Sequence, residues 1–108
     1  MTTLPKQVQQ EAQRGLIVRV LVDWQLEWMP CGELRLQLLR RTGYPIADAE
    51  LQFHLKYLSE TGYVETKQLR AARAGLELTA VRATAKAVDW TEGRLPPDPA
   101  LGGCSGAL

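Results

Sequence analysis

Apolar side chains recur every four residues over positions 4–28 and predict a long first helix. The stripe consists of Val8, Ala12, Leu16, Val20 and Trp24, widened by Ile17, Leu21 and Trp28. Gly15 interrupts the pattern at a cost of about 1 kcal/mol relative to alanine. This glycine therefore indicates either a close contact with another element or a break between an N-terminal arm and the helix proper. Pro30 disfavours helical backbone at Met29 and ends the element.

A second helix is predicted over residues 31–41, with Leu34, Leu38 and Leu39 on its inner face. Gly43 follows and can take the left-handed conformation in which many helices end. Arg40 and Arg41 precede this stop, where their charges suit the negative end of the helix dipole.

A third helix is predicted over residues 46–61, because Leu51, Leu55 and Leu58 recur at spacings of four and three. Gly62 then stops the helix without the steric penalty of a side chain. At about 100° per residue, inward leucines leave a distinct outward face. Its members are Ala49, Phe53, Lys56 and Glu60, flanked by Gln52 and Tyr57.

Beyond Gly62 the period changes to the alternation that is typical of strands. We expect one strand over residues 63–69, a hairpin tip over residues 70–75 and a second strand over residues 76–79. Thr79 would then cap a short last helix that runs to about residue 90. The inward positions beyond this cap would be Val81, Ala85, Val88 and Trp90.

The composition of the chain changes from Gly93 onward, where three prolines and four glycines occur. Such a segment has too little apolar surface to offset the entropy of ordering. We therefore expect one domain over residues 1–93 and a disordered tail over residues 94–108. A chain of 108 residues with 45% hydrophobic content is large enough for one hydrophobic core.

Two short segments resemble the winged-helix family. The first is a histidine–leucine pair, a further leucine, then glycine, a bulky apolar residue and valine: His54, Leu55, Leu58, Gly62, Tyr63 and Val64. The second is the sequence LELTA at residues 76–80, which resembles the end of the wing. Within the family the chain resembles small winged-helix proteins of Mu-like bacteriophages and prophages. It resembles arsenic-repressor-type and antibiotic-resistance-type regulators more distantly.

The resemblance implies a mainly α fold with a small β-hairpin: three helices, a two-stranded wing and a short C-terminal helix. It also implies a cytoplasmic transcriptional regulator of a phage or prophage. Such regulators bind double-stranded DNA, typically as homodimers, with the third helix in the major groove and the wing near the backbone.

The sequence departs from the family pattern at two points. Phe53 precedes His54, where serine, threonine or arginine is usual. The third helix also carries three carboxylates against Lys56 alone, a net charge of −2 that meets phosphates unfavourably. The net charge of the whole chain is only +1.

If the third helix enters the groove, Gln52, Phe53 and Lys56 face the bases, with Gln52 suited to an adenine edge. Lys56 suits a phosphate or a guanine. Candidates for phosphate contacts lie in the wing and at the end of the second helix: Lys67, Arg70, Arg73, Arg40 and Arg41. The alternatives are a solvated helix face, ordinary solubility charges and stabilisation of a helix end.

Three tryptophans stand in a chain with one phenylalanine, and two of them, Trp24 and Trp28, are one helical turn apart. They can belong to the core. They can also form a dimer interface together with Trp90, because tryptophan is enriched at interface centres.

A protein-interaction module without DNA binding is the competing hypothesis. An outward Phe53 beside Tyr57, on a helix of net charge −2, suits a protein surface better than a phosphate backbone. The partner would be a phage or host protein.

The sequence shows no pattern that predicts catalysis or a cofactor. His54 is the only histidine, and neither it nor the two cysteines, Cys31 and Cys104, have metal-ligand spacing. No phosphate loop or nucleophile elbow is visible. We therefore expect no enzyme and no metal site, with His54 structural and both thiols reduced. We also expect no signal peptide and no membrane span, since the longest apolar run, residues 15–22, is far too short.

Overall fold

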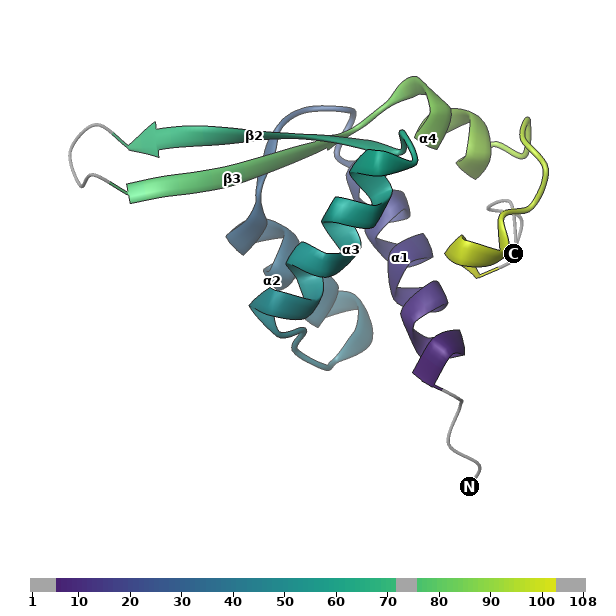
Figure 1. Cartoon of the computed structure of the whole chain (residues 1–108), viewed down its shortest axis with the longest axis horizontal. Helices are drawn as coiled ribbons and strands as arrows, with labels where there is room; N and C mark the ends of the chain where they lie inside the picture. The colour runs from purple at the N-terminus through teal and green to yellow at the C-terminus, as the bar shows by residue number, and fades with distance from the viewer. Residues whose placement is uncertain (1–5, 72–75, 103–108) are drawn as a thin grey trace.

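The computed structural model describes residues 6–71 and 76–102 of the chain. Its elements are α1 (Lys6–Asp23), β1 (Met29–Pro30), α2 (Cys31–Thr42), α3 (Asp48–Glu60), β2 (Val64–Ala71), β3 (Leu76–Ala83), α4 (Ala85–Thr91) and a 3-10 turn, η1 (Pro99–Leu101). The first three helices pack together, and the β2–β3 hairpin projects from them to one side (Figure 1). This is the winged-helix fold that the sequence predicts.

The sheet has three antiparallel strands in the order β1-β3-β2. Strands β2 and β3 pair from Val64 opposite Ala83 to Ala71 opposite Leu76. The short strand β1 adds Met29 opposite Val81, a pairing that the sequence did not predict. Strand β1 lies in the connection between α1 and α2, directly before α2. Its pairing with β3 therefore joins the base of the hairpin to the helices.

Helix α1 is shorter than predicted and presents a different face to the core. Its buried side chains are Ile17, Val18, Val20 and Leu21, whereas Val8 and Trp24 remain 42% and 38% exposed. A spacing of four advances about 400° around a helix, so it drifts by about 40° at every step. The predicted stripe from Val8 to Trp24 was therefore wrong at both ends. The helix stops at Asp23, and residues 25 and 26 turn the chain with a φ of 63° each.

The second and third helices follow the predicted pattern closely. Leu34 and Leu38 are buried in α2, although Leu39, also expected inside, is 37% exposed. Gly43 ends α2 with a φ of 76°, and its N–H donates to the Leu39 carbonyl at 2.8 Å. In α3 the three leucines at positions 51, 55 and 58 are all buried. Gly62 ends the following turn with a φ of 87°.

The predicted cap of the last helix was wrong. Strand β3 continues to Ala83, so Thr79 lies within it, and Thr84 caps α4 by accepting from the Ala87 N–H. The Thr84 hydroxyl also donates to the Gly62 carbonyl at 2.6 Å. Pairing with two neighbouring strands extends β3, and this long-range contact outweighs the local capping signal at Thr79.

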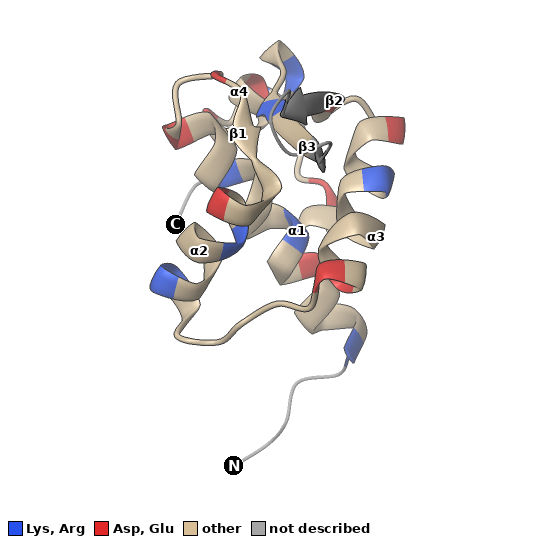
Figure 2. Cartoon of the chain, turned by 90° about the vertical axis from the view of Figure 1, so that its left-hand side faces the viewer, with Lys and Arg blue, Asp and Glu red and all other residues tan. Residues whose placement is uncertain are grey.

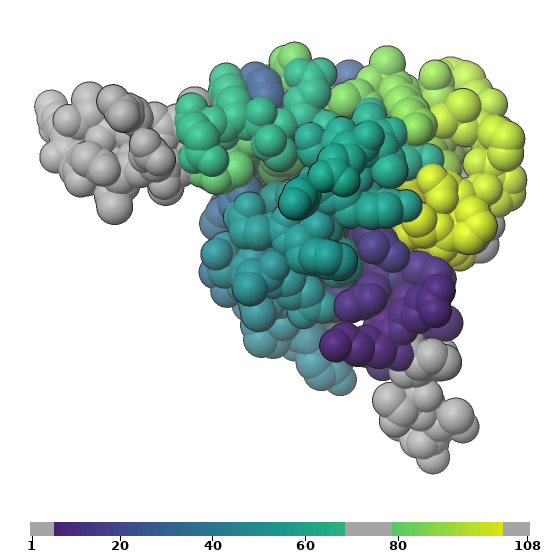
Figure 3. All heavy atoms as spheres, in the orientation of Figure 1, coloured from purple at the N-terminus to yellow at the C-terminus, as the bar shows by residue number. Residues whose placement is uncertain are grey.

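The segment after α4 packs against the helices as far as Gly102, within the range over which we expect a disordered tail. We call residues 94–102 the C-terminal strap. Leu101 is only 2% exposed, and the Tyr63 hydroxyl donates to Asp98 Oδ2 at 2.7 Å. In Figure 3 the strap, in yellow, lies against α1, in purple. Burial of Leu101 and the bond to Asp98 both oppose the conformational entropy of the strap. The remainder of the predicted tail, residues 103–108, lies outside the described residues.

Gly15 explains how the strap approaches α1 so closely. A Cβ at this position would lie 2.4 Å from the Leu101 carbonyl oxygen. Of the two roles predicted for this glycine, the structure shows the close contact, because α1 continues through it without a break.

Candidate nucleic-acid interface

The outer face of α3 is open to solvent, as the leucine spacing predicted. Ala49, Gln52, Phe53, Lys56 and Glu60 are all exposed, and Phe53 keeps 58% of its surface accessible. Acidic residues mark both ends of α3, with one basic position between them (Figure 2). A face of this kind can contact a partner without any rearrangement of the helix.

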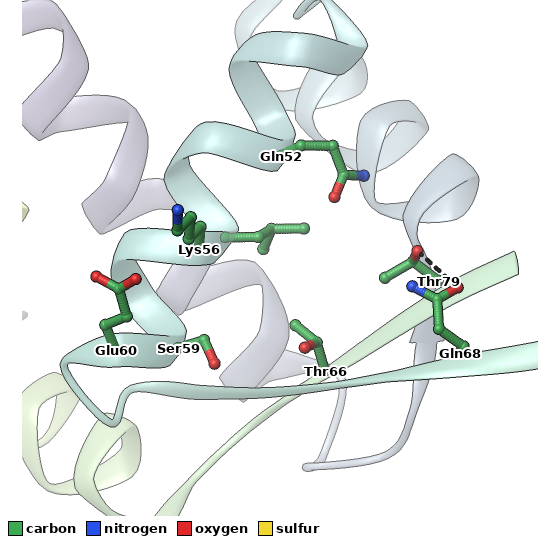
Figure 4. Close-up of a pocket in the computed structure, with 8 residues that line it drawn as sticks. Gln52, Lys56, Ser59, Glu60, Thr66, Gln68 and Thr79 are labelled. Carbon is green, nitrogen blue, oxygen red and sulfur yellow. Dashed lines mark hydrogen bonds between the residues drawn. The ribbon is translucent and has the colours of Figure 1, made fainter.

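An open groove of about 310 Å³ lies between α3 and the hairpin. Residues of α3 form one wall, and residues of β2 and β3 form the other: Gln52, Leu55, Lys56, Ser59, Glu60, Thr66, Gln68 and Thr79. Figure 4 shows the labelled side chains around this space, with the Thr79 hydroxyl donating to Gln68 Oε1 at 3.4 Å. Hydroxyl and amide groups predominate, and Lys56 and Glu60 are the two charged residues in the lining.

Sequence reasoning missed the hairpin wall of this groove. Thr66 and Gln68 face α3 because alternate residues of a strand share a face. That alternation was visible in the sequence. The register that brings Thr79 opposite Gln68 was not.

Lys67 lies on the opposite face of the hairpin from the groove. Its Nζ is 4.2 Å from the centre of the Trp28 ring, and the Arg82 guanidinium stacks on the same ring at 4.6 Å. Arg82 also pairs with Glu65 at 3.1 Å. The structure therefore does not bring Lys67 together with the candidate base-reading residues of α3.

The structure describes three of the four other residues that were predicted to contact phosphates. Arg70 belongs to β2, where its backbone pairs with Glu77, and Arg73 lies outside the described residues. Arg40 is exposed at the end of α2. Arg41 pairs with Asp23 at 2.9 Å, but both side chains are well exposed, so this ion pair contributes little to stability.

Most of the described basic side chains already have partners within the chain. Besides those above, Arg14, Arg19 and Lys86 stack on aromatic rings, Arg35 donates to the Ile46 carbonyl, and Arg94 pairs with Asp89 and Glu92. Among the side chains that the structure describes, Lys6, Arg40 and Lys56 have no such contact. Lys56 is therefore the free cation on the α3 face.

The side chain of His54, a residue of α3, is completely buried. Its Nε2 lies 3.1 Å from Gln13 Oε1 and 3.9 Å from Glu50. Burial lowers the pKa of His54, and the nearby Arg14 charge lowers it further, while Glu50 opposes both. The neutral ring thus joins α3 to α1. Within the described ranges, no three His, Cys, Asp or Glu side chains gather closely enough to hold a metal.

Cys31 is buried at the start of α2. Burial raises the pKa of its thiol, the polar Gln52 side chain lowers it, and the charge of Asp48 raises it.

The three tryptophans do not form one surface. Trp90 is 0% exposed and packs edge-on against Tyr63, with ring centres 6.3 Å apart, so its predicted place in a dimer interface was wrong. Arg19 of α1 stacks on the same ring at 5.1 Å, because α4 packs across α1. Trp28 is half-buried under its two cations, and Trp24 is exposed.

No family model matches the chain, and no curated protein matches it significantly. A solved structure does match: that of a candidate transcriptional regulator from Thermoplasma acidophilum. The two share 23% identity over 71% of this chain and 72% of the other, with a TM-score of 0.58. At this identity the likeness shows a common fold.

None of the helices within residues 6–71 and 76–102 has the length and apolar character needed to cross a bilayer.

Proposed function

We propose that the protein binds double-stranded DNA, with α3 in the major groove and the hairpin beside the backbone. The observation that carries this proposal is the outer face of α3, where Gln52, Phe53 and Lys56 are exposed beside a polar groove. An exposed helix of this size fits the major groove. The naming of the Thermoplasma structure as a candidate transcriptional regulator adds support at the level of the fold.

In this proposal the protein is a transcriptional regulator of the phage or prophage type and acts in the cytoplasm without catalysis. The support is the sequence resemblance described above. Homodimerisation would bring two copies of α3 to one operator, with Trp24 and Trp28 at the contact between copies. A sedimentation mass equal to that of one chain at high concentration would exclude the dimer.

Electrostatics sets the expected strength of binding. Helix α3 contributes a net charge of −2, and most described cations are held internally. Phosphate contacts therefore fall to Lys56, Arg40 and the two arginines of the wing, Arg70 and Arg73. Because each neutralised phosphate contributes about 0.9 to the salt slope, we expect a shallow dependence of affinity on salt.

A titration with duplex DNA at low salt tests the proposal directly. Replacing both Arg70 and Arg73 with alanine should weaken binding and reduce the salt slope by up to about two. The matched control is Lys67→Ala, which removes a wing cation on the opposite face of the hairpin and should leave the slope unchanged. Absence of any affinity of the intact protein for duplex DNA at low salt would exclude DNA binding.

A protein-interaction module is the second candidate, and the exposure of Phe53 on an acidic helix favours it. A single aromatic residue can dominate such an interface. In that case Phe53→Ser should leave folding intact but abolish binding to a phage or host protein, while duplex DNA is not bound by either form. A large loss of thermal stability in the variant would place Phe53 in the core and contradict this candidate.

A further inference from the structure

Three exposed side chains in the first half of α3 share one face. Ala49, Gln52 and Phe53 stand at positions i, i+3 and i+4, so they are neighbours on the helix surface. Asp48 and Glu50 lie about 100° to either side of Ala49 and therefore flank this face. In helix-turn-helix proteins the N-terminal residues of the recognition helix contact the base edges. These three residues are therefore in the position from which a recognition helix contacts bases.

The chemistry of this triplet matches one kind of base pair. A glutamine amide can bond adenine N6 and N7 together, and alanine and phenylalanine make apolar contacts with the thymine methyl group. The usual guanine readers are arginine and lysine, and residues 48–55 of α3 contain neither. The basic residue of the helix, Lys56, stands one turn further on.

Gln52 is placed for such a contact at the edge of the groove. It is exposed, and in Figure 4 its side chain reaches from α3 over the groove. Its amide can offer both a hydrogen and the carbonyl oxygen to a base.

We propose that the Ala49–Gln52–Phe53 face of α3 reads A·T base pairs in the major groove, with Gln52 on adenine and Ala49 and Phe53 against thymine methyl groups. The inference rests on the proposed DNA binding and adds the kind of sequence that is bound. It follows that selectivity comes from amide and methyl contacts, whereas the few free cations supply little of it.

The test compares labelled duplexes of about 20 bp, two helical turns, whose central segments contain only A·T or only G·C pairs. At low salt the A·T duplex should bind about ten-fold more tightly, within the range expected of one good bidentate contact and its neighbours. Equal affinity for the two duplexes would overturn the inference and leave the proposed function standing. Binding to neither duplex would overturn both.

Two base analogues identify the contacts themselves. Uracil in place of thymine removes the methyl groups, and 7-deazaadenine removes the N7 acceptor; each should weaken binding of the natural protein several-fold. Phe53→Ala should become less sensitive to uracil, with Ala49 still in contact with a methyl group, and Gln52→Ala should become largely insensitive to 7-deazaadenine. The control is Gln37→Ala on α2, whose amide is bonded to Glu33 and which should respond to both analogues like the natural protein. An A·T preference unaffected by both analogues would indicate readout of DNA shape and overturn the inference.

Discussion

The two sides of the helical bundle differ in how they are covered: the C-terminal strap closes one, and the outer face of α3 leaves the other open. On the strap side, Arg14 bonds the Ala100 carbonyl and covers Tyr57, and Gly15 brings the Leu101 backbone against α1. On the outer side of α3, Phe53 is left 58% exposed beside a polar groove. Aromatic and basic side chains thus close the first side, whereas on the second side they remain available for the partner that we propose.

The largest expected effect is on the closed side, at Gly15. Gly15→Ala should reduce the free energy of unfolding by about 1–3 kcal/mol, since the new Cβ would collide with the Leu101 carbonyl. The matched control is Gly32→Ala in α2, where nothing lies within 4 Å of the new atom and helix propensity should add up to about 1 kcal/mol. Urea unfolding of both variants measures the difference. Equal free energies of unfolding for the two variants would show that the strap does not pack tightly against α1 at Gly15.

His54, whose ring joins α3 to α1, should make the free energy of unfolding depend on pH. Its pKa is lowered in the folded chain from the ordinary 6.5, so the unfolded chain binds the proton first as the pH falls. Above pH 6.5 both states are neutral and stability is unaffected. Below it, stability should fall by up to about 1.4 kcal/mol per pH unit until the folded pKa is reached.

Thermal or urea unfolding at pH 7.5 and about 5 measures this loss. His54→Gln should lower stability at both values but reduce the difference between them. An unchanged difference in the variant would assign the pH dependence to other groups.

A smaller effect is expected where the strap meets the hairpin. Tyr63→Phe removes the hydroxyl that donates to Asp98 and should cost about 1 kcal/mol, the net value of one such hydrogen bond. Burial, followed by the bond and charge of Asp98, raises the pKa of Tyr63, so the phenol stays protonated through the neutral range. Faster amide exchange confined to residues 94–102 should accompany the loss. Unaltered exchange there would contradict a role for this bond in holding the strap.

The smallest effect on stability should come from the open side. Phe53→Ser should change the free energy of unfolding by no more than about 0.5 kcal/mol, as for other exposed positions. Its effect on ligand binding should be much larger than its effect on folding. A loss of 2 kcal/mol or more would mean that Phe53 packs within the fold, and the contrast between the two sides would not hold.

Local signals in the sequence predicted the elements that carry the candidate site. The leucine spacing of α3 oriented its outer face correctly, because side-chain direction in a helix depends only on position in the turn. The helix stop at Gly43 and the left-handed turn at Gly62 were equally readable, since a left-handed backbone favours glycine. The same local reasoning failed for α1, where eight apolar positions could not all face one core.

The sequence by itself therefore determined the winged-helix class, the glycine stops after α2 and α3 and the exposed face of α3. Only the tertiary structure decided that Lys67 contacts Trp28 on the side of the hairpin away from the groove, that Trp90 belongs to the core and that the strap docks on Gly15. The physical reason is distance along the chain. Periodicity fixes directions within one element, whereas these three outcomes depend on contacts between residues dozens of positions apart, which local propensities do not encode.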